Sequence, residues 1–487
     1  MLKWLEWVNG FVWGIPALFL ILSVGLYLSF RTGFAQLRLF PHAVRLFVHK
    51  LKTPASGKGV SSYQSLCTAL AATVGTGNIA GVAGALALGG PGALFWMLMA
   101  AVVGMVLKLA EASLAVKYRG VDRSGNLFGG PMYMIEKGMG RKFRFLAIAY
   151  AALGLIAAFG VGNATQINAV LDGIRVGFGL KNSVSRDLLI GAVIAVVAAV
   201  AMLGGAKRIA SFAEYLVPAA SLIYVLLGLG VIAIHLERLP AVLRCVVCGA
   251  FSPEGMTGGA VGSFFVALRI GVSRGVFTNE AGMGTAAMAH GCAQVDHPIE
   301  QGLMGIVEVF LDTVVICTVT ALAILTSGVP ICFGLDEGAA LTANAFSQTY
   351  GGWSGAILAV FLCAFAFATI LGWGLYGCRC AAYLFGESAF RPFVILQTIL
   401  MVASCALKTR VVWLFAETLN GLMVIPNLIA LTCLTPTFAE LLKEYKYIRS
   451  SLSAHGGTYE SIDQCKPLRA LSHEKIPSSG CGSRAAG

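Results

Sequence analysis

Long apolar stretches follow one another along almost the whole chain, and short polar segments separate them. A helix needs about 20 predominantly apolar residues to cross the hydrocarbon core of a bilayer. Stretches of that length recur often enough to predict an all-α integral membrane protein. We expect eleven membrane-spanning helices, at residues 11–30, 63–89, 91–116, 145–174, 187–205, 209–236, 258–290, 299–328, 354–386, 390–407 and 411–436.

Two of these predicted spans are interrupted by runs of glycine and polar residues. The run TVGTGN at 73–78 lies within the span 63–89, and the run TNEAGMGT at 278–285 lies within the span 258–290. Glycine weakens a helix, and lipid tolerates freed backbone groups only where they face protein or a solvated cavity. Two interrupted helices at matching positions in two halves of a chain predict a transporter whose binding site lies near the middle of the bilayer.

The ten spans after the first divide into five and five, and each half opens with an interrupted segment. Because each half has an odd number of spans, the two halves insert with opposite orientation. This is the arrangement of an inverted repeat. We therefore expect repeats at 63–257 and 258–436. Before them, 1–62 would hold the extra N-terminal helix and a basic amphipathic segment at the membrane interface. After them, 437–487 would form a partly disordered tail, because its end is rich in Ser, Gly and Lys.

Composition and charge narrow the function further. Hydrophobic residues make up 57% of the chain, charged residues only 12%, and the mean hydropathy is +0.80. The net charge of +12 is unevenly spread, with about 24 Lys and Arg on one set of alternate loops and about 8 on the other. Because positively charged loops stay in the cytoplasm, we expect an outside N-terminus and a cytoplasmic C-terminus. The charge then faces membrane lipid, and we expect no nucleic acid as a partner.

The first interruption offers groups that could hold a small charged ligand. Restarting helix N–H groups favour an anion such as a carboxylate, whereas freed carbonyls coordinate a cation. Gly75 and Gly77 would let a ligand approach the backbone, and Thr73, Thr76 and Asn78 add side-chain oxygens. Helix packing through small residues explains the glycines alone. It does not explain two threonines and an asparagine at membrane depth, so we favour a site.

The second interruption carries charged residues as well. Within the membrane such residues are expensive and are a functional hypothesis by default. Thr278 and Asn279 are the better ligand candidates. Glu280, Arg269 and Arg274 fit gating or structural roles, and an ion pair that holds the helices together remains an equal alternative.

Further polar residues lie inside other spans. Gln166, in a cluster with Asn163 and Asn168, would hydrogen-bond a small polar substrate or merely bridge two helices. Thr369 and Trp373 are four residues apart and share one helix face, so a hydroxyl and a large ring can line one cavity. A tryptophan in such a pocket would leave room only for a small ligand.

Three more expectations concern charge and thiols. An unpaired carboxylate at Asp312, in mid-span, would be untenable, so we expect a cation partner. Lys108 and Glu111 lie one turn apart and predict a local pair. Cys245 and Cys248 fall in a predicted outside loop at 237–257, where a lone CxxC supports a disulfide only weakly.

Nothing in the sequence predicts catalysis. A nucleotide-binding GxxxxGK[ST] loop is missing from the sequence, so ATP-driven pumping is unsupported. His290 and His297 have no matching cluster of metal ligands. We therefore expect neither an enzyme nor an organic cofactor.

Several runs together give the chain a resemblance to one family. It resembles the bacterial and archaeal alanine or glycine:cation symporters, the sodium/alanine symporters. The resembling runs cover about residues 10–445; they are VGTGNIAGVA at 74–83, GGPMY at 129–133, GGAKRIA at 204–210, RGVFTNEAGMGT at 274–285, DHP at 296–298, QG at 301–302, TILGW at 369–373 and YG at 376–377.

The resemblance implies a fold like that of the bacterial leucine transporter, with five-plus-five inverted repeats and one extra N-terminal helix. It also implies which residues bind. The substrate carboxylate would meet the backbone N–H groups of Thr76 and Gly77, with Asn78 close by. The rest of the pocket would be formed by Gln166, Phe277, Thr278, Thr369 and Trp373.

The resemblance further implies two Na⁺ positions. One would use the carbonyls of Ala71 and Val74 with the Thr369 hydroxyl. The second would use Thr73, Asn78, Thr278 and Asp312. The family often has Ser where this chain has Ala368, and Glu where it has Cys378. The first departure removes one oxygen that could bind Na⁺.

We therefore expect Na⁺-coupled symport of alanine or glycine by alternating access, in the plasma (inner) membrane of a bacterium. Na⁺ would be the transported coupling ion. Two alternatives stay open from the residues: an H⁺-coupled symporter, with Asp312 or Glu280 as the proton carrier, and an amino-acid-gated channel or sensor.

Overall fold

The computed structural model describes residues 2–52, 59–122, 125–181, 183–252, 264–335, 338–406 and 409–454. The chain separates into two compact units, at 1–438 and 439–487. In the second unit the described residues belong to α23 (Thr435–Ala454), which begins at the end of the first unit. The remainder of the expected tail, from residue 455, lies outside the described residues.

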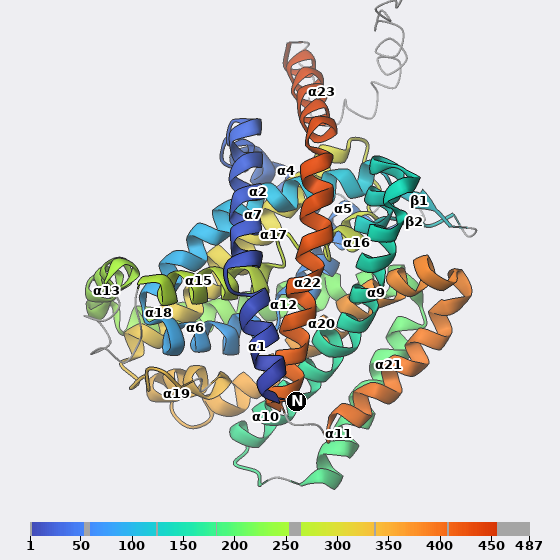
Figure 1. The fold of residues 1–487 in the computed structure, drawn as a ribbon. Helices are drawn as coiled ribbons and strands as arrows, with labels where there is room; N and C mark the ends of the chain where they lie inside the picture. The colour runs from blue at the N-terminus through green and yellow to red at the C-terminus, as the bar shows by residue number, and fades with distance from the viewer. Residues whose placement is uncertain are drawn as a thin grey trace, which may run out of the picture. The chain divides into compact units, whose positions relative to one another are not determined.

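The first unit is almost entirely helical (Figure 1). Its N-terminal helices are α1 (Leu2–Val12), α2 (Ile15–Thr32), α3 (Ala35–Arg38) and α4 (Phe40–Lys52). The next helices up to the first long loop are α5 (Ser62–Thr73), the π-helical η1 (Gly77–Gly81), α6 (Val82–Gly89) and α7 (Gly92–Lys117). A short antiparallel hairpin of β1 (Gly120–Val121) and β2 (Leu127–Phe128) follows.

The remaining helices of the expected first repeat are α8 (Pro131–Tyr133), η2 (Met134–Met139), η3 (Arg141–Phe143), α9 (Arg144–Phe159), η4 (Gly160–Ala164), α10 (Thr165–Gly177), α11 (Val184–Met202), α12 (Gly205–Ile234), η5 (Leu236–Arg238) and α13 (Leu239–Phe251). Those of the expected second repeat are α15 (Phe264–Asn279), α16 (Ala287–His290), α17 (Pro298–Val309), η6 (Phe310–Cys317), α18 (Thr318–Ser327), α19 (Ala339–Tyr350), α20 (Ser354–Phe385), η7 (Glu387–Ala389), α21 (Phe390–Ser404) and α22 (Thr409–Cys433). Of the short segments, η2, η4 and η6 are π-helical, and η3, η5 and η7 are 3₁₀ turns.

Helices occupy the positions of all eleven expected spans. Among the described residues, eight helices are long and apolar enough to cross a membrane, and one bent pair raises the number to nine. The other two positions hold α15 with α16 and α21, whose helices of 16, 4 and 15 residues are shorter. The all-helical membrane fold is confirmed, whereas a count of eleven complete spans is not.

Most of the segment 237–257, predicted as an outside loop between two spans, is helical. Residues Leu239–Phe251 form helix α13, which begins with Pro240 in its first turn, a position where proline favours a helix. Cys245 and Cys248 lie on this helix as free thiols. Helix α19, which packs against α18 and α20, was also not predicted.

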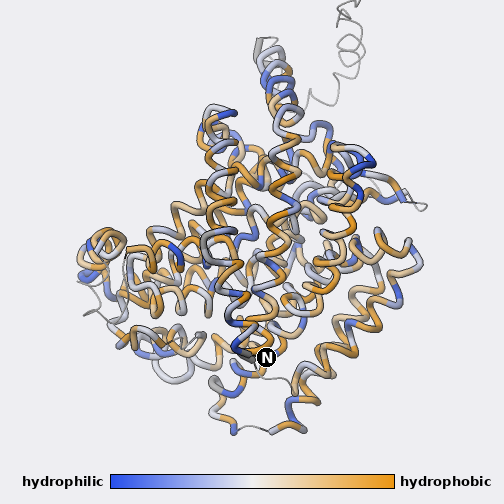
Figure 2. The backbone as a smooth tube through the Cα atoms, in the orientation of Figure 1, coloured by the Kyte–Doolittle hydropathy of each residue, from blue (hydrophilic) through white to orange (hydrophobic). Residues whose placement is uncertain are grey.

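Hydrophobic residues lie on the exposed faces of several helices as well as on the faces that pack against other helices. Leu189, Val193 and Val196 of α11 are more than half exposed, as are Leu222 and Leu226 of α12. Figure 2 shows hydrophobic positions along most of the helices and hydrophilic ones gathered toward loops and helix ends. Such an exterior suits hydrocarbon as the surrounding solvent.

The first interruption is a real break in a helix. A capping box between Ser61 and Gln64 starts α5. The helix ends at Thr73, because Val74 takes extended backbone (φ −75°, ψ 96°). The chain restarts at Gly77, and the two halves are bent by 54°.

The second interruption is longer. Helix α15 ends at Asn279, and α16 begins only at Ala287. Between them Glu280, Gly282 and Gly284 adopt positive φ angles of 54°, 87° and 76°. Glycine takes this left-handed conformation without strain, whereas a residue with a Cβ does so at a cost of about 1–2 kcal/mol. The glycines of this run thus allow the chain to leave the helix, and Glu280 is held there by its contacts.

Candidate functional site

The two helix breaks lie against each other. A Cβ added at Gly77 would come within 3.2 Å of Thr278 Cγ2 and 3.8 Å of Phe277 Cδ1. Only a glycine allows this approach without movement of the neighbour. The runs at 73–78 and 278–285, about 200 positions apart in the chain, are therefore neighbours in space, as the sequence predicted.

Asn78 connects the first break to the span formed by α17, η6 and α18. Its Nδ2 donates to Asp312 Oδ1 at 2.8 Å and to the Asp312 carbonyl at 3.2 Å. On the other side, its Oδ1 accepts from the Gly75 N–H at 2.9 Å. The side chain thus fixes the shape of the break and its distance from Asp312.

Asp312 joins both breaks, because Asn279 reaches the same place from the second one. Asn279 Nδ2 donates to Thr313 Oγ1 at 3.1 Å, and that hydroxyl donates to Asp312 Oδ2 at 3.0 Å. Asp312 is fully buried in the π-helical turn η6. The expected cation partner is not a side chain of the described residues, because an amide and a hydroxyl supply the hydrogen bonds to this carboxylate.

A carbonyl and a hydroxyl from different helices meet just before the first break. Thr369 Oγ1 of α20 donates to the Ala71 carbonyl of α5 at 3.0 Å. A Cβ at Gly75 would lie 2.7 Å from this hydroxyl, so the site requires glycine. Because α5 ends beside Val74, its last carbonyls have no helical partner. Neutral oxygens of this kind suit Na⁺.

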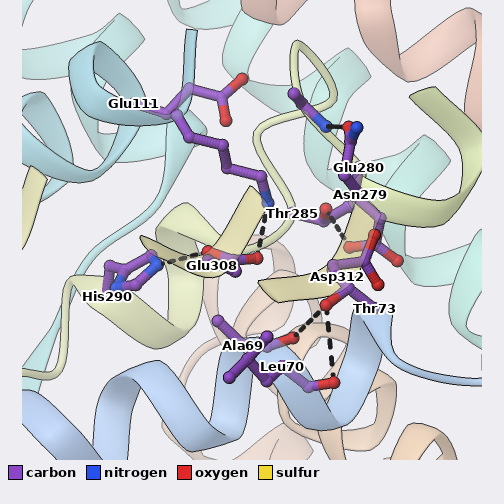
Figure 3. A network of polar contacts seen from close by, with 12 residues as sticks. Ala69, Leu70, Thr73, Glu111, Asn279, Glu280, Thr285, His290, Glu308 and Asp312 are labelled. Carbon is purple, nitrogen blue, oxygen red and sulfur yellow. Dashed lines mark hydrogen bonds and ion pairs between the residues drawn. The ribbon is translucent and has the colours of Figure 1, made fainter. Parts of the chain in front are cut away.

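Two other proposed cation ligands turn elsewhere. The Thr73 hydroxyl donates back to the Ala69 and Leu70 carbonyls at 3.3 and 3.5 Å (Figure 3). The Thr278 hydroxyl donates to the Gly275 carbonyl at 2.8 Å. In the part of the chain that the structure describes, no group of three or more His, Cys, Asp or Glu side chains could hold a metal ion. The oxygens gathered near the first break are mainly neutral ones, with the Asp312 carboxylate beside them.

Gln166 contacts the first break, whereas Trp373 contacts the π-helical turn η4 and the second break. Gln166 Oε1 accepts from Thr76 Oγ1 at 3.4 Å, and its amide donates to the Val161 carbonyl in the π-helical turn η4. Trp373 is fully buried, and its Cβ occupies the space that a side chain at Gly162 would need. Asn163 belongs to another contact, since it exchanges hydrogen bonds with Gln397 of α21.

The sequence predicted a gating or structural role for Glu280 but not the partners of its carboxylate. Its Oε1 accepts from the Trp373 indole N–H at 2.9 Å, and its Oε2 accepts from Thr285 Oγ1 at 2.5 Å. The carboxylate thus ties the second break to α20. No motif in the sequence marks this partnership.

The predicted pairing of Lys108 with Glu111 was wrong. Lys108 Nζ pairs with Glu308 Oε1 of α17 at 2.9 Å, and both side chains are completely buried. Glu111 Oε1 instead accepts from the N–H groups of Gly282 and Gly284 at 3.0 and 3.2 Å. Neighbouring helices are close enough here to outcompete the local pair.

The Lys108–Glu308 pair extends into a buried network (Figure 3). Glu308 Oε2 contacts His290 Nε2 at 2.8 Å, and His290 Nδ1 contacts Gln301 Nε2 at 2.7 Å. Gln301 Oε1 then accepts from Ser62 Oγ at 2.6 Å. The network joins α5, α7, α16 and α17, which are the elements that carry both breaks or pack beside them.

A cavity of about 1220 Å³ adjoins the first break. Its lining includes Ala80 and Gly81 of η1 and an ion pair between Arg274 NH1 and Glu417 Oε1 at 2.7 Å. Trp413 also lines it and lies 5.8 Å, ring to ring, from Phe277. Phe277 is thus placed between the cavity and Gly77. Arg269, the other basic residue of the same segment, is exposed.

The fold and this site define a class: a multi-pass membrane carrier built around two broken helices. Comparison with known proteins gives the particular family. The chain belongs to the sodium:alanine symporter family, whose model matches residues 1–455. It is therefore a sodium-coupled amino-acid symporter and not an enzyme.

Relatives cover nearly the full chain. It is 42% identical over 447 residues to an uncharacterized transporter of Haemophilus influenzae, spanning 90% of this chain and 94% of that one. It is 40% identical over 448 residues to the sodium/alanine symporter AgcS of Methanococcus maripaludis, spanning 91% and 97%. Identity to the probable sodium/glutamine symporter GlnT of Bacillus subtilis is 38% over 440 residues, spanning 90% and 89%.

Among solved structures, the chain is similar in fold to MhsT, crystallised in complex with L-phenylalanine. The TM-score is 0.55 at 12% sequence identity, with 80% of this chain and 99% of that chain covered. This likeness concerns the fold alone. It confirms the expected leucine-transporter-like architecture.

Proposed function

We propose that the protein carries alanine, or glycine, together with Na⁺ across the plasma membrane of a bacterium by alternating access. The observation that carries the proposal is the contact between two unwound backbone segments, joined through Asp312 by Asn78 and by Asn279 with Thr313. One relative is a sodium/alanine symporter, which supports alanine as the substrate. Another relative is named a probable sodium/glutamine symporter, and glutamine is larger than alanine. We therefore propose that the size of the binding pocket selects a small amino acid in this chain.

The amino acid would bind at the first break. The backbone N–H groups of Thr76 and Gly77 begin the restarting helix and carry its partial positive charge, which favours a carboxylate. Asn78 and Asn279 would line the same space. Gln166 and the hydroxyls of Thr278 and Thr369 supply oxygens for the ammonium group, and the rings of Phe277 and Trp373 would limit the length of the side chain.

Na⁺ would bind in two places. The first uses the carbonyls of Ala71 and Val74 with the hydroxyl of Thr369, a set supported by the 3.0 Å contact between Thr369 Oγ1 and the Ala71 carbonyl. The second uses Asp312 and Asn78, to which the hydroxyls of Thr73 and Thr278 would turn when the ion is bound. A carboxylate in this second set supplies the charge that a buried cation needs.

Coupling follows from where these ligands bind. A ligand shifts a conformational equilibrium only by its difference in affinity for the two states. Na⁺ at the first site would hold α5 against α20, and the substrate would need the resulting shape of the first break. The membrane potential adds about 2.3 kcal/mol per charge per 100 mV to Na⁺ entry. Alternating access would move the repeats 63–257 and 258–436 around this fixed site, with the N-terminus outside and the C-terminus in the cytoplasm.

Uptake into proteoliposomes tests the proposal. Radiolabelled alanine should accumulate above its outside concentration when a Na⁺ gradient points inward, and unlabelled glycine should compete. Asn78→Leu should abolish this uptake while leaving the protein folded in the membrane. Ser451→Ala, near the end of α23, is the matched control and should transport normally.

Two results would refute the proposal. Accumulation in Na⁺-free buffer that follows a pH gradient would mean proton coupling. Equilibration of alanine without any accumulation would mean a channel or sensor.

A further inference from the structure

A groove on the membrane-facing side of α12 is not accounted for by transport. It has a volume of about 600 Å³ and is lined by Arg208, Ser211, Phe212, Tyr215, Leu216 and Phe367. Apart from Arg208 and a serine, the lining is aromatic and aliphatic.

The lining residues of α12 form one helix face. Their numbers follow the spacing i, i+3, i+4, i+7 and i+8 from Arg208, which places them on a single stripe. Tyr215 is 76% exposed and Phe212 43% exposed. Phe367 of α20 forms the opposite wall. The same stripe continues into exposed Leu222 and Leu226, which are surfaces for hydrocarbon.

Positive charge lies at one end of the groove only. Lys207 and Arg208 are both exposed in the first turn of α12. The nearest acidic residue of this helix, Glu214, faces α5, where it accepts from Gln64 Nε2 at 2.8 Å. No acidic residue lines the groove, and among the described residues no ion pair involves Lys207 or Arg208.

We propose that this groove is a binding site for one anionic phospholipid, with its phosphate at Lys207 and Arg208 and an acyl chain along Phe212, Tyr215, Leu216 and Phe367. The distance from Arg208 to Leu216 is about 12 Å, from eight residues at about 1.5 Å each. This is close to the depth of about 15 Å of one hydrocarbon leaflet. A basic residue near an anionic headgroup and an apolar wall below it match the two parts of such a lipid.

The proposed lipid would lie close to the transport site without being part of it. Phe367 is two residues before Thr369 in α20, so the two side chains point to different sides of that helix. Thr369 faces Ala71 of α5. Binding of this lipid would not depend on which amino acid is transported.

Native mass spectrometry of the delipidated protein in detergent tests the headgroup. Phosphatidylglycerol and phosphatidylcholine with identical acyl chains would be added separately at equal, low molar ratios. We expect one phosphatidylglycerol to be retained, and Arg208→Gln to weaken its retention about fivefold. Arg391→Gln, at an exposed arginine of α21, is the matched control and should change nothing. Equal retention of the two lipids would overturn the proposal.

A groove-filling variant tests the acyl chain. Ser211→Trp should displace the lipid, whereas Leu222→Trp, on the exposed stripe beyond the groove, should not. If Ser211→Trp does not fold, the double variant Phe212→Ala with Leu216→Ala removes the apolar wall instead and should also lose the lipid. Undiminished retention in these variants would contradict the proposal. Complete displacement of the phosphatidylglycerol by glycerol phosphate alone would also contradict it, because the acyl chain would then contribute nothing to binding. A dimer that Ser211→Trp dissociates would contradict it too, because a second copy of the chain would then occupy the groove.

Discussion

The indole N–H of Trp373 donates a hydrogen bond to Glu280 Oε1 across 2.9 Å. This contact ties α20, which also carries Thr369, to the break between α15 and α16. Glu280 keeps its left-handed backbone, and Trp373 is completely buried. The position of the ring that would limit the substrate pocket is therefore set by a residue that need not touch the substrate.

Removing the Glu280 carboxylate should loosen the pocket. In Glu280→Ala the Trp373 N–H and the Thr285 hydroxyl lose their acceptor in a dry interior, which costs about 1–3 kcal/mol for each group. We expect a lower midpoint of thermal unfolding, a higher KM for alanine and measurable competition by larger amino acids. Glu280→Gln keeps an acceptor for the indole and should restore the KM. Equal substrate selectivity in both variants would count against a positioning role.

Gly75→Ala should eliminate transport. The added Cβ would lie 2.7 Å from Thr369 Oγ1, which displaces the hydroxyl from the Ala71 carbonyl. Gly81→Ala is the matched control in the same broken span, because Gly81 is helical and a Cβ there meets nothing within 4 Å. Uptake of labelled alanine by the two variants, at equal amounts of folded protein, measures the difference. Normal uptake by Gly75→Ala would show that this approach of α20 is not needed.

Thr369→Val should weaken Na⁺ binding specifically. Valine keeps the shape but removes the hydroxyl oxygen proposed as a ligand, and losing such a contact costs on the order of 1.4 kcal/mol, or about tenfold in half-saturating Na⁺. Thr398→Val is the control, because that hydroxyl donates to the Val394 carbonyl of its own helix. The Na⁺ dependence of alanine uptake measures both. An unchanged Na⁺ requirement in Thr369→Val would remove this residue from the cation site.

Breaking the buried Lys108–Glu308 pair should destabilise the protein. Lys108→Met removes the ammonium group and leaves the buried Glu308 carboxylate with His290 as its remaining partner, and breaking a buried ion pair typically costs about 3–5 kcal/mol. The double variant Lys108→Met with Glu308→Gln removes the stranded charge and should recover part of the loss. Thermal unfolding in detergent measures both variants. A double variant less stable than Lys108→Met would contradict this expectation. It would mean that the contact of the Glu308 carboxylate with His290 stabilises the protein more than its pairing with Lys108 does.

The sequence predicted an all-helical membrane fold and the positions of the two interrupted helices. The length of a membrane-spanning helix follows from the thickness of the hydrocarbon layer. The runs at 73–78 and 278–285 contain residues that end helices locally. Both features therefore depend on residues that are close together in the sequence. The helix α13 escaped prediction because a short apolar segment with charges is equally compatible with a loop. The substrate and cation roles assigned to these runs remain predictions.

The sequence by itself thus determined that the protein is an all-helical membrane protein and where its two helices are broken. Only the tertiary structure decided which polar groups meet: Asn78 with Asp312, 234 positions apart, Trp373 with Glu280, 93 apart, and Lys108 with Glu308, 200 apart. Each of these partnerships depends on how helices rotate and pack against one another. A buried polar side chain takes the partner that packing brings within reach, and sequence spacing does not contain that information.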